Sequence, residues 1–202
     1  MRRSEYFNIA RLENYHWWYK ANREFSLNLL DKYLPLKPEL NVLDTGCGAG
    51  GTTVSLKRYG RVVGVDYNPI AIKLAKKYPI DQLLQADINR LPFKKNSFEL
   101  VTSFDVLYHK RVNITSALTE IFRVLRPGGY FLARVPAFEF LFGPHDKFVH
   151  TGRRFKASQL KHLFEITGFK VKRITYFNWS LFLPVWFWRT TSRTQSSSDI
   201  QS

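Results

Sequence analysis

Short apolar segments and amphipathic segments alternate along the central part of the chain. The apolar segments predict strands at residues 41–45, 61–66, 82–87, 98–104, 130–135 and 170–177. The amphipathic segments predict helices from about residue 52 to 59 and at residues 68–78, 114–125 and 158–169. In residues 114–125 the apolar side chains recur every three or four residues, which predicts one buried helix face. This alternation predicts a mostly parallel sheet with helices on both faces.

The two ends of the chain differ from this central pattern. Residues 5–34 predict a helix dense in aromatic side chains, which two prolines within residues 34–40 bring to an end. The N-terminus has no apolar stretch typical of a secretory signal. The run LFLPVWFW, residues 181–188, is too short to span a bilayer, and a polar tail follows it. We therefore divide the chain into an N-terminal helical lid (1–38), a central domain (39–180) and a shortened C-terminal part (181–202).

Composition and charge narrow the class of protein. The 202 residues are 45% hydrophobic and 23% charged, as in globular proteins. A single cysteine, Cys47, excludes an internal disulfide and a cysteine metal cluster, and it fits a cytoplasmic protein. Lysine and arginine number 31 against 16 acidic residues, and the last third is the most basic. This excess fits an anionic partner, either RNA or a membrane surface in a peripheral protein, and equally a surface charge that only keeps the protein in solution.

Acidic residues follow the predicted strands, and a glycine-rich turn follows the first. Asp44, Asp66 and Asp87 each end a strand, and Phe104-Asp105 ends the fourth. Ligands of parallel α/β sheets bind at the carboxyl ends of the strands, so these residues predict a binding site. The turn from Gly46 to Gly51 fits the G-x-G-x-x-G pattern of dinucleotide sites, which alone is a weak signal.

Three features separate this pattern from that of a nicotinamide dinucleotide site. Asp44 stands two residues before the first glycine, where a carboxylate would repel a pyrophosphate and attract an amine or sulfonium. Asp87-Ile88 places a carboxylate beside an apolar side chain, a pair that suits an adenine. The turn Pro127-Gly128-Gly129 precedes the fifth predicted strand.

With these motifs in this order, residues 41–177 resemble the class I S-adenosylmethionine-dependent methyltransferases, specifically the type 11-like group. The carrying segments are VLDTGCGAGG, VVGVDYNPIAIKLAKK, LLQADINRLPFKKNSFELVTSFDVLYH and EIFRVLRPGGYFLARVPAF. The segment HWWYKANRE further resembles a small bacterial subgroup with an N-terminal His-Trp-Trp helix. The resemblance implies a Rossmann-like, doubly wound αβα sandwich with six to seven strands. The family's seventh strand has no counterpart in the pattern after residue 188, which puts activity in doubt.

The resemblance also implies S-adenosyl-L-methionine as cofactor and S-adenosyl-L-homocysteine as product. It assigns cofactor contacts along the strand ends and, from the subgroup, to an arginine of the lid. The implied residues are Arg23, Asp44, Gly46, Cys47, Gly48, Asp66, Tyr67, Asp87, Ile88 and Phe104. Ordinary packing is the alternative for Tyr67, Ile88 and Phe104, helix capping for the three aspartates, and a plain surface position for Arg23.

Three histidines are candidates for a general base or a substrate contact. His145 and His150 lie in FGPHDKFVHTGRRF, and His109 follows the fourth predicted strand. The alternative is that each histidine only holds a loop. The spacing matches no zinc pattern, so we predict no structural metal.

The sequence thus favours methyl transfer to a small-molecule acceptor, with a lipid- or sugar-linked molecule as one candidate. RNA is a second candidate acceptor, although the chain has no appended RNA-binding module. A third hypothesis is a cofactor-binding protein without turnover, and a nicotinamide oxidoreductase is the fourth.

Overall fold

The computed structural model describes residues 3–34 and 39–177, apart from the side chain of residue 145. The helices are α1 (Arg3–Leu12), α2 (Trp17–Tyr33), α3 (Pro69–Ala75), α4 (Ile114–Val124), α5 (Pro144–Phe148) and α6 (Ala157–Ile166). Two 3₁₀ helices are η1 (Thr53–Tyr59) and η2 (Glu139–Leu141). The strands are β1 (Leu40–Thr45), β2 (Gly60–Asp66), β3 (Gln82–Gln85), β4 (Phe98–Phe104) and β5 (Leu125–Arg134).

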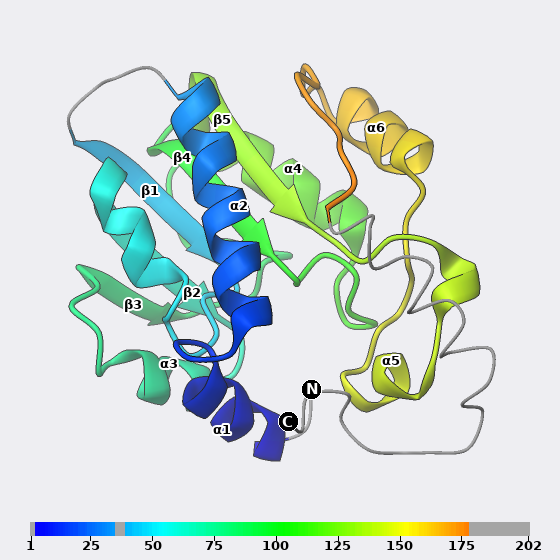
Figure 1. Cartoon of the computed structure of the whole chain (residues 1–202). Coiled ribbons are helices and arrows are strands. Elements are labelled where there is room, and N and C mark those ends of the chain that lie inside the picture. Colours follow the sequence, from blue (N-terminus) through cyan, green and yellow to red (C-terminus); the bar gives the residue numbers. More distant parts are fainter. Residues whose placement is uncertain (1–2, 35–38, 178–202) are drawn as a thin grey trace.

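The five strands form one parallel sheet in the order β3-β2-β1-β4-β5. The chain moves outward from β1 to β3 and then returns to the other side of β1 with β4 (Figure 1). Strand order therefore reverses between β1 and β4, and the carboxyl ends of these two strands form the crevice in which such sheets bind ligands. The α/β class predicted from the sequence is confirmed.

Helices cover both faces of the sheet. On one face, Leu30 of α2 and Leu56 of η1 pack against Val42, Val62 and Leu100 of the central strands. On the other face, the apolar side of α4 and Leu160 of α6 cover the opposite side chains of the same strands. This burial fixes the strand ends in place, so the loops that follow the strands start from a rigid frame.

The prediction of six to seven strands is wrong for the described residues, which hold five. Residues 170–177 were predicted as a strand, but they form no ladder. Their side chains instead pack on neighbouring elements. Lys172 Nζ lies 5.0 Å from the ring centre of Tyr130, and the ring of Phe177 stacks on Phe25 of α2 at 4.3 Å. This segment therefore contacts its neighbours through side chains and not through a strand ladder.

The N-terminal helix also differs from the prediction, because it is two helices and not one. The chain leaves α1 after Leu12, and α2 begins at Trp17, where the Trp18 amide donates to His16 Nδ1 at 3.3 Å. The break frees Glu13 to reach the glycine-rich turn. The predicted unit of residues 181–202 lies outside the described residues, and so does its apolar run.

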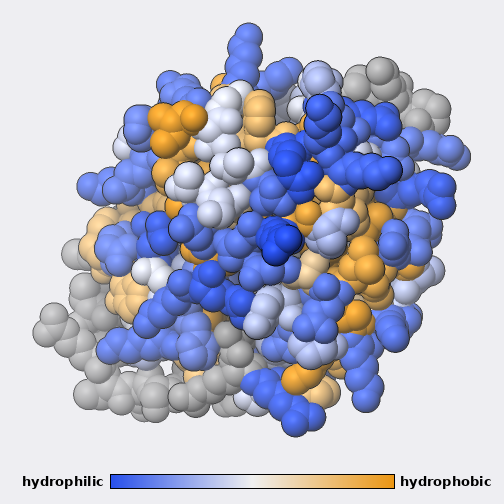
Figure 2. Space-filling view, turned by 180° about the vertical axis from the view of Figure 1, so that it is seen from behind, coloured by the Kyte–Doolittle hydropathy of each residue, from blue (hydrophilic) through white to orange (hydrophobic). Residues whose placement is uncertain are grey.

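The rear face of the molecule is mainly hydrophilic, with apolar residues in separate patches (Figure 2). Exposed apolar side chains include Phe122 of α4 and Ile166 of α6. Within residues 3–34 and 39–177, no helix is both long enough and apolar enough to cross a membrane.

Candidate functional site

Asp44 lies at the bottom of the crevice and is almost fully buried. Its carboxylate accepts hydrogen bonds from Thr53 Oγ1 at 2.6 Å and from Thr102 Oγ1 at 2.7 Å. Burial raises the pKa of Asp44, and the two hydroxyl donors oppose that rise. The two hydrogen bonds therefore hold the Asp44 carboxylate in one orientation at the carboxyl end of β1.

The glycine-rich turn leaves β1 sharply. The amides of Gly46 and Cys47 both donate to Val65 O, at 2.7 and 2.9 Å. Gly48 has a φ of +54°, and a Cβ placed there would meet nothing within 4 Å. The backbone at Gly48 thus faces open space, which allows a ligand to approach it closely. Burial raises the pKa of the Cys47 thiol. Cys47 therefore lines this turn as a protonated thiol and is not a nucleophile.

Asp66 ends β2 beside this turn. One carboxylate oxygen accepts from the Gly48 amide at 3.1 Å, and the other accepts from the Asn68 amide at 2.8 Å. Burial raises the pKa of Asp66, and the two amides oppose that rise. A carboxylate offers about four acceptor positions, so Asp66 retains capacity for ligand hydroxyls after holding these amides.

The third acid follows β3 by two residues. Asp87 Oδ1 accepts from the backbone and side-chain nitrogens of Asn89, and Oδ2 lies 3.5 Å from Arg111 Nη2. The Arg111 guanidinium also lies 3.0 Å from the ring centre of Tyr67. Ile88 is buried beside Asp87. Tyr67, Asp87 and Ile88 therefore meet at one corner of the crevice, with Arg111 as a neighbour that the sequence did not indicate.

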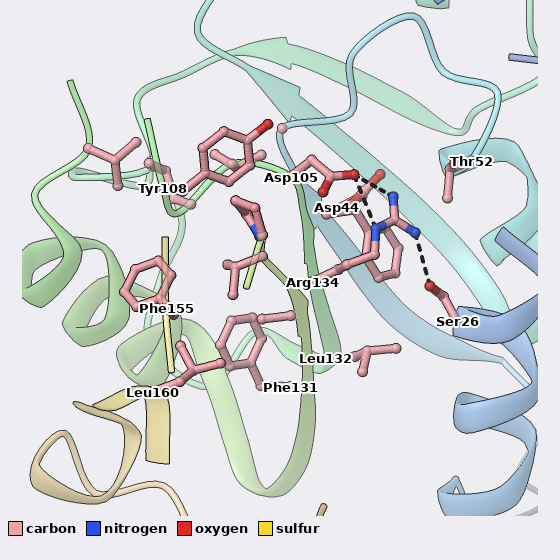
Figure 3. Close-up of a pocket in the computed structure, with 18 of the residues that line it drawn as sticks. Ser26, Asp44, Thr52, Asp105, Tyr108, Phe131, Leu132, Arg134, Phe155 and Leu160 are labelled. Carbon is pink, nitrogen blue, oxygen red and sulfur yellow. Dashed lines mark hydrogen bonds and ion pairs between the residues drawn. The ribbon is translucent and has the colours of Figure 1, made fainter. Parts of the chain in front are cut away.

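All of these groups line one cavity of about 1730 Å³, which continues past the end of β4 toward β5. The glycine-loop half is bounded by Asp44, Gly46–Gly48 and Asp66. The β5 half is mainly apolar, and Figure 3 shows its side chains around the opening. Its described walls include Tyr108, Phe131, Leu132, Phe155 and Leu160.

Asp105 and Arg134 stand at the border between the two halves. Arg134 donates through Nε and Nη2 to Asp105 Oδ2, at 3.1 and 2.5 Å, and through Nη1 to Asn22 O and Ser26 Oγ of α2 (Figure 3). Asp105 adopts a φ of +59°, which is costly for a residue other than glycine. The ion pair thus joins the ends of β4 and β5 to α2 over the cavity, and Phe104 is buried directly beneath it.

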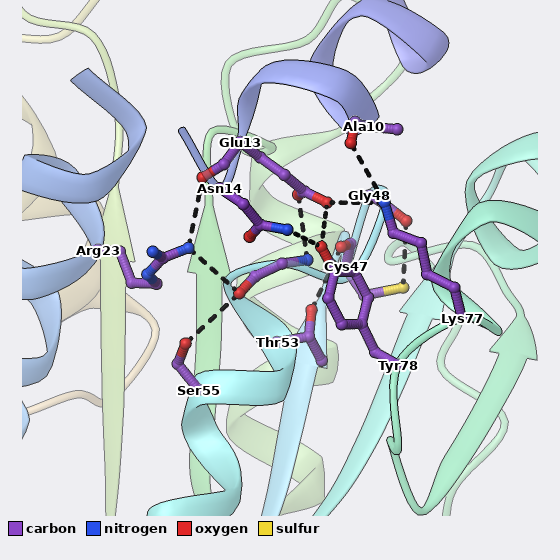
Figure 4. A network of polar contacts seen from close by, with 11 residues as sticks. Ala10, Glu13, Asn14, Arg23, Cys47, Gly48, Thr53, Ser55, Lys77 and Tyr78 are labelled. Carbon is purple, nitrogen blue, oxygen red and sulfur yellow. Dashed lines mark hydrogen bonds and ion pairs between the residues drawn. The ribbon is translucent and has the colours of Figure 1, made fainter. Parts of the chain in front are cut away.

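The lid closes over the glycine-loop half through Glu13, which is buried (Figure 4). Its carboxylate accepts from the Gly51 amide at 3.0 Å and from the Tyr78 hydroxyl at 3.0 Å, and Lys77 Nζ lies 3.8 Å away. A Cβ on Gly51 would lie 2.4 Å from Glu13 Cδ, so a side chain at that position would displace this carboxylate. Further along the lid, Tyr6 of α1 lies near Asp66, and its pKa is raised to about 12 by burial and by that charge.

Arg23 is not among the described residues that line the cavity. Its Nη1 lies within hydrogen-bond distance of Glu13 O and Gly51 O, at 3.4 and 3.5 Å. In this position Arg23 ties α2 to the glycine-rich turn, and the predicted cofactor contact gains no support.

The three histidines are placed differently. His109 lines the cavity, and its Nδ1 is buried without a hydrogen-bond partner. Burial lowers the pKa of His109, so its ring is neutral near pH 7. His150 also lines the cavity but is exposed, with a φ of +60°. His145 belongs to α5, and its side chain lies outside the described part of the structure.

A buried ion pair holds the loop that carries His145 and His150. The Arg154 guanidinium contacts both carboxylate oxygens of Asp146 at 2.9–3.0 Å, and it also donates to Ala137 O. The backbone amide of Arg154 donates to Glu139 Oε2. The role of this pair is to fix residues 137–154 over the β5 half. In the described residues, no group of three or more His, Cys, Asp or Glu side chains is arranged to hold a metal ion.

The fold and this crevice have the arrangement of a Rossmann-like α/β protein, a class that binds its ligands at the switch point of the sheet. A methyltransferase domain model matches residues 43–133. The uncharacterised methyltransferase YodH of Bacillus subtilis is 34% identical over 150 residues, which cover 71% of this chain and 63% of YodH. Residues 43–133 are thus a methyltransferase domain of the class I type, a type whose cofactor is S-adenosyl-L-methionine.

Two further comparisons agree with this family. The demethylmenaquinone methyltransferase of Lactiplantibacillus plantarum is 29% identical over 208 residues, covering 85% of this chain and 84% of that protein. The crystal structure of the YcgJ protein of Bacillus subtilis matches with a TM-score of 0.63 and 27% identity, over 71% of this chain and 68% of that one. The chain spans 52 to 66% of the lengths of the first three curated relatives that it matches.

Proposed function

We propose that this chain transfers the methyl group of S-adenosyl-L-methionine to a small-molecule acceptor with an apolar body. The observation that carries the proposal is the continuity of the cavity, since residues of the glycine-loop half and of the β5 half line the same cavity. The cavity of about 1730 Å³ also runs along β5 as far as Arg126 and Gly129, so only the part beside Phe104 and Asp105 adjoins the glycine-loop half, and the acceptor would lie in that part.

In this proposal the glycine-loop half holds the cofactor. Asp66 would accept hydrogen bonds from the ribose hydroxyls, and Asp87 with Ile88 would bind the adenine edge and face. Gly48 allows close approach of the backbone, and buried Asp44 places negative charge near the methionyl end. The family assigns these contacts, and the free lone pairs of Asp66 and the open space at Gly48 support them.

The bound cofactor supplies a methyl group already activated by its sulfonium. Transfer of that methyl group to the acceptor would leave S-adenosyl-L-homocysteine, a neutral thioether. The protein must therefore hold the acceptor in line with the methyl–sulfur bond and, for a hydroxyl or a carbon acid, remove one proton. His109 is the candidate proton acceptor, because it lines the cavity and its lowered pKa leaves it neutral.

The apolar walls of the β5 half favour an acceptor with an apolar body over a free sugar. The name of the Lactiplantibacillus relative, a demethylmenaquinone methyltransferase, points in the same direction. The described residues add no support to the RNA or membrane partners considered from the charge, and those remain predictions.

The test is to incubate the chain with methyl-labelled S-adenosyl-L-methionine and separate bacterial extracts of lipids, small polar metabolites and RNA. We expect label in an organic-soluble product that depends on the chain. Label confined to RNA would replace this proposal with the RNA alternative. Tight cofactor binding without label in any extract would favour a binding protein without turnover.

A further inference from the structure

The acidic residues that line the cavity differ in whether they have a hydrogen-bond or ion-pair partner. Six of the seven have partners: Glu13, Asp44, Asp66, Asp87, Asp105 and Asp146. The seventh is Glu5 of α1, which also lines the cavity and is only 4% exposed. Among the residues that the structure describes, it is the one cavity-lining acid without a hydrogen-bond or ion-pair partner.

The Glu5 side chain is largely buried, but its carboxylate oxygens are not among the fully buried atoms that lack a partner, so they are open to the cavity. A carboxylate in this position has lost part of its hydration, which a positively charged ligand group would replace. The position of Glu5 in the first turn of α1 favours negative charge through the helix dipole. That effect would act equally on an exposed side chain, so it does not explain burial inside a cavity. The chain carries 31 basic residues, and none of the described ones pairs with Glu5.

The surroundings of Glu5 suit a positively charged ligand group. Tyr19 lies close enough that the charges of Glu5 and Asp105 raise its pKa further, after the larger effect of burial. Trp18, Tyr19 and Tyr108 present aromatic rings to the same cavity. Aromatic faces together with a carboxylate attract organic cations more strongly than neutral groups of the same shape. Arg134 is already paired with Asp105 and is held by α2, so its charge is committed elsewhere.

We propose that Glu5 binds the positive charge of a ligand in this cavity, an ammonium or a sulfonium group. The inference rests on the proposed function, since the two sources of such a group are the methionyl end of the cofactor and a cationic acceptor.

The test compares Glu5→Gln, which keeps the shape and removes the charge, with Glu24→Gln, which alters an exposed carboxylate of α2. Calorimetry measures three ligands. S-adenosyl-L-methionine carries sulfonium and ammonium charges, S-adenosyl-L-homocysteine carries only the ammonium, and methylthioadenosine carries neither. With S-adenosyl-L-homocysteine bound, a second arm compares choline with its neutral isostere 3,3-dimethyl-1-butanol by saturation-transfer NMR.

We expect Glu5→Gln to weaken at least one charged ligand by about tenfold, the size of one close charge–charge interaction, and to leave its neutral counterpart unchanged. Loss for S-adenosyl-L-methionine alone assigns the sulfonium, and loss for both amino-acid-bearing ligands assigns the ammonium. Loss for choline alone assigns the acceptor. Glu24→Gln should behave like the unaltered chain throughout.

Two results would overturn the inference: no ligand affected, or charged and neutral ligands weakened alike. Failure of the proposed function has a different signature, because the unaltered chain itself would then not bind S-adenosyl-L-homocysteine. In that case the assignment of Glu5 falls with it.

Discussion

In the glycine-loop half of the cavity, each acidic side chain is held by short hydrogen bonds from the backbone or from a buried hydroxyl. Asp44 and Asp66 each have two such donors. In the β5 half the walls are mainly rings and aliphatic groups, and the polar side chains form ion pairs across loops, as Asp146 and Arg154 do. The glycine-loop half therefore has a fixed shape that suits one ligand. The shape of the β5 half, in contrast, depends on the contacts that hold residues 137–154 in place.

The largest expected effect comes from releasing residues 137–154, the loop that covers the β5 half. In Arg154→Ala, Asp146 would remain buried without its partner, which costs about 3–5 kcal/mol of unfolding free energy. Chemical denaturation measures this loss. Binding of S-adenosyl-L-homocysteine by the molecules that remain folded should change less than threefold. A large loss of cofactor affinity at full folding would show that the two halves are not separate.

The converse change removes a carboxylate from the glycine-loop half. Asp66→Ala removes the acceptor of two backbone amides and of the ribose contacts, and should weaken S-adenosyl-L-homocysteine more than about hundredfold. His145→Ala provides the comparison in the same titration, with affinity unchanged. Equal loss in both variants would contradict the assignment of roles.

His109 tests the chemistry of the β5 half. If it removes a proton from the acceptor, His109→Gln lowers the transfer rate by about hundredfold or more and leaves cofactor affinity intact. Burial lowers the pKa of His109, so its neutral form persists as the pH falls through the ordinary histidine value of about 6.5. The rate should therefore decline only at more acidic pH. A decline already at higher pH would point to another base.

The smallest effect concerns the lid. Glu13→Ala leaves the Gly51 amide without its acceptor, and should weaken cofactor binding by about tenfold. Glu13→Gln keeps an acceptor oxygen and should recover most of that loss. Glu24→Ala, an exposed change on α2, is the control. If the Gln variant is as weak as the Ala variant, charge at Glu13 matters more than its hydrogen bond.

Glu13 also has a pH signature. Burial raises its pKa, so the folded state holds the Glu13 proton more tightly than the unfolded state does. Its contribution to stability is therefore greatest below the ordinary glutamate pKa and is lost as the pH rises through the raised value. The difference in unfolding free energy between the unaltered chain and Glu13→Gln should follow this trend. The opposite trend would mean that the charged form is the stabilising one.

The strand ends were predictable because alternation, glycine turns and terminal acids are local patterns. Asp44, Asp66 and Asp87 lie where the sequence placed them, and the parallel order then brings them together. Glu5, Glu13, Arg111 and Arg134 were missed, because their roles depend on contacts between segments far apart in the chain. Glu13 meets Gly51 only because α1 ends at Leu12, and no local signal marks that break as functional. Residues 170–177 were wrongly predicted as a strand for a related reason. Alternation indicates that side chains pack, but it does not show which element they pack against.

The most direct measurement is a calorimetric titration of the unaltered chain with S-adenosyl-L-homocysteine, with NADH as the control. The glycine-loop half, with Asp44 ahead of the turn and Asp66 beside Gly48, predicts micromolar binding of S-adenosyl-L-homocysteine and none of NADH. Binding of NADH in its place, or of neither ligand by a chain that melts cooperatively, would contradict this account of the cavity.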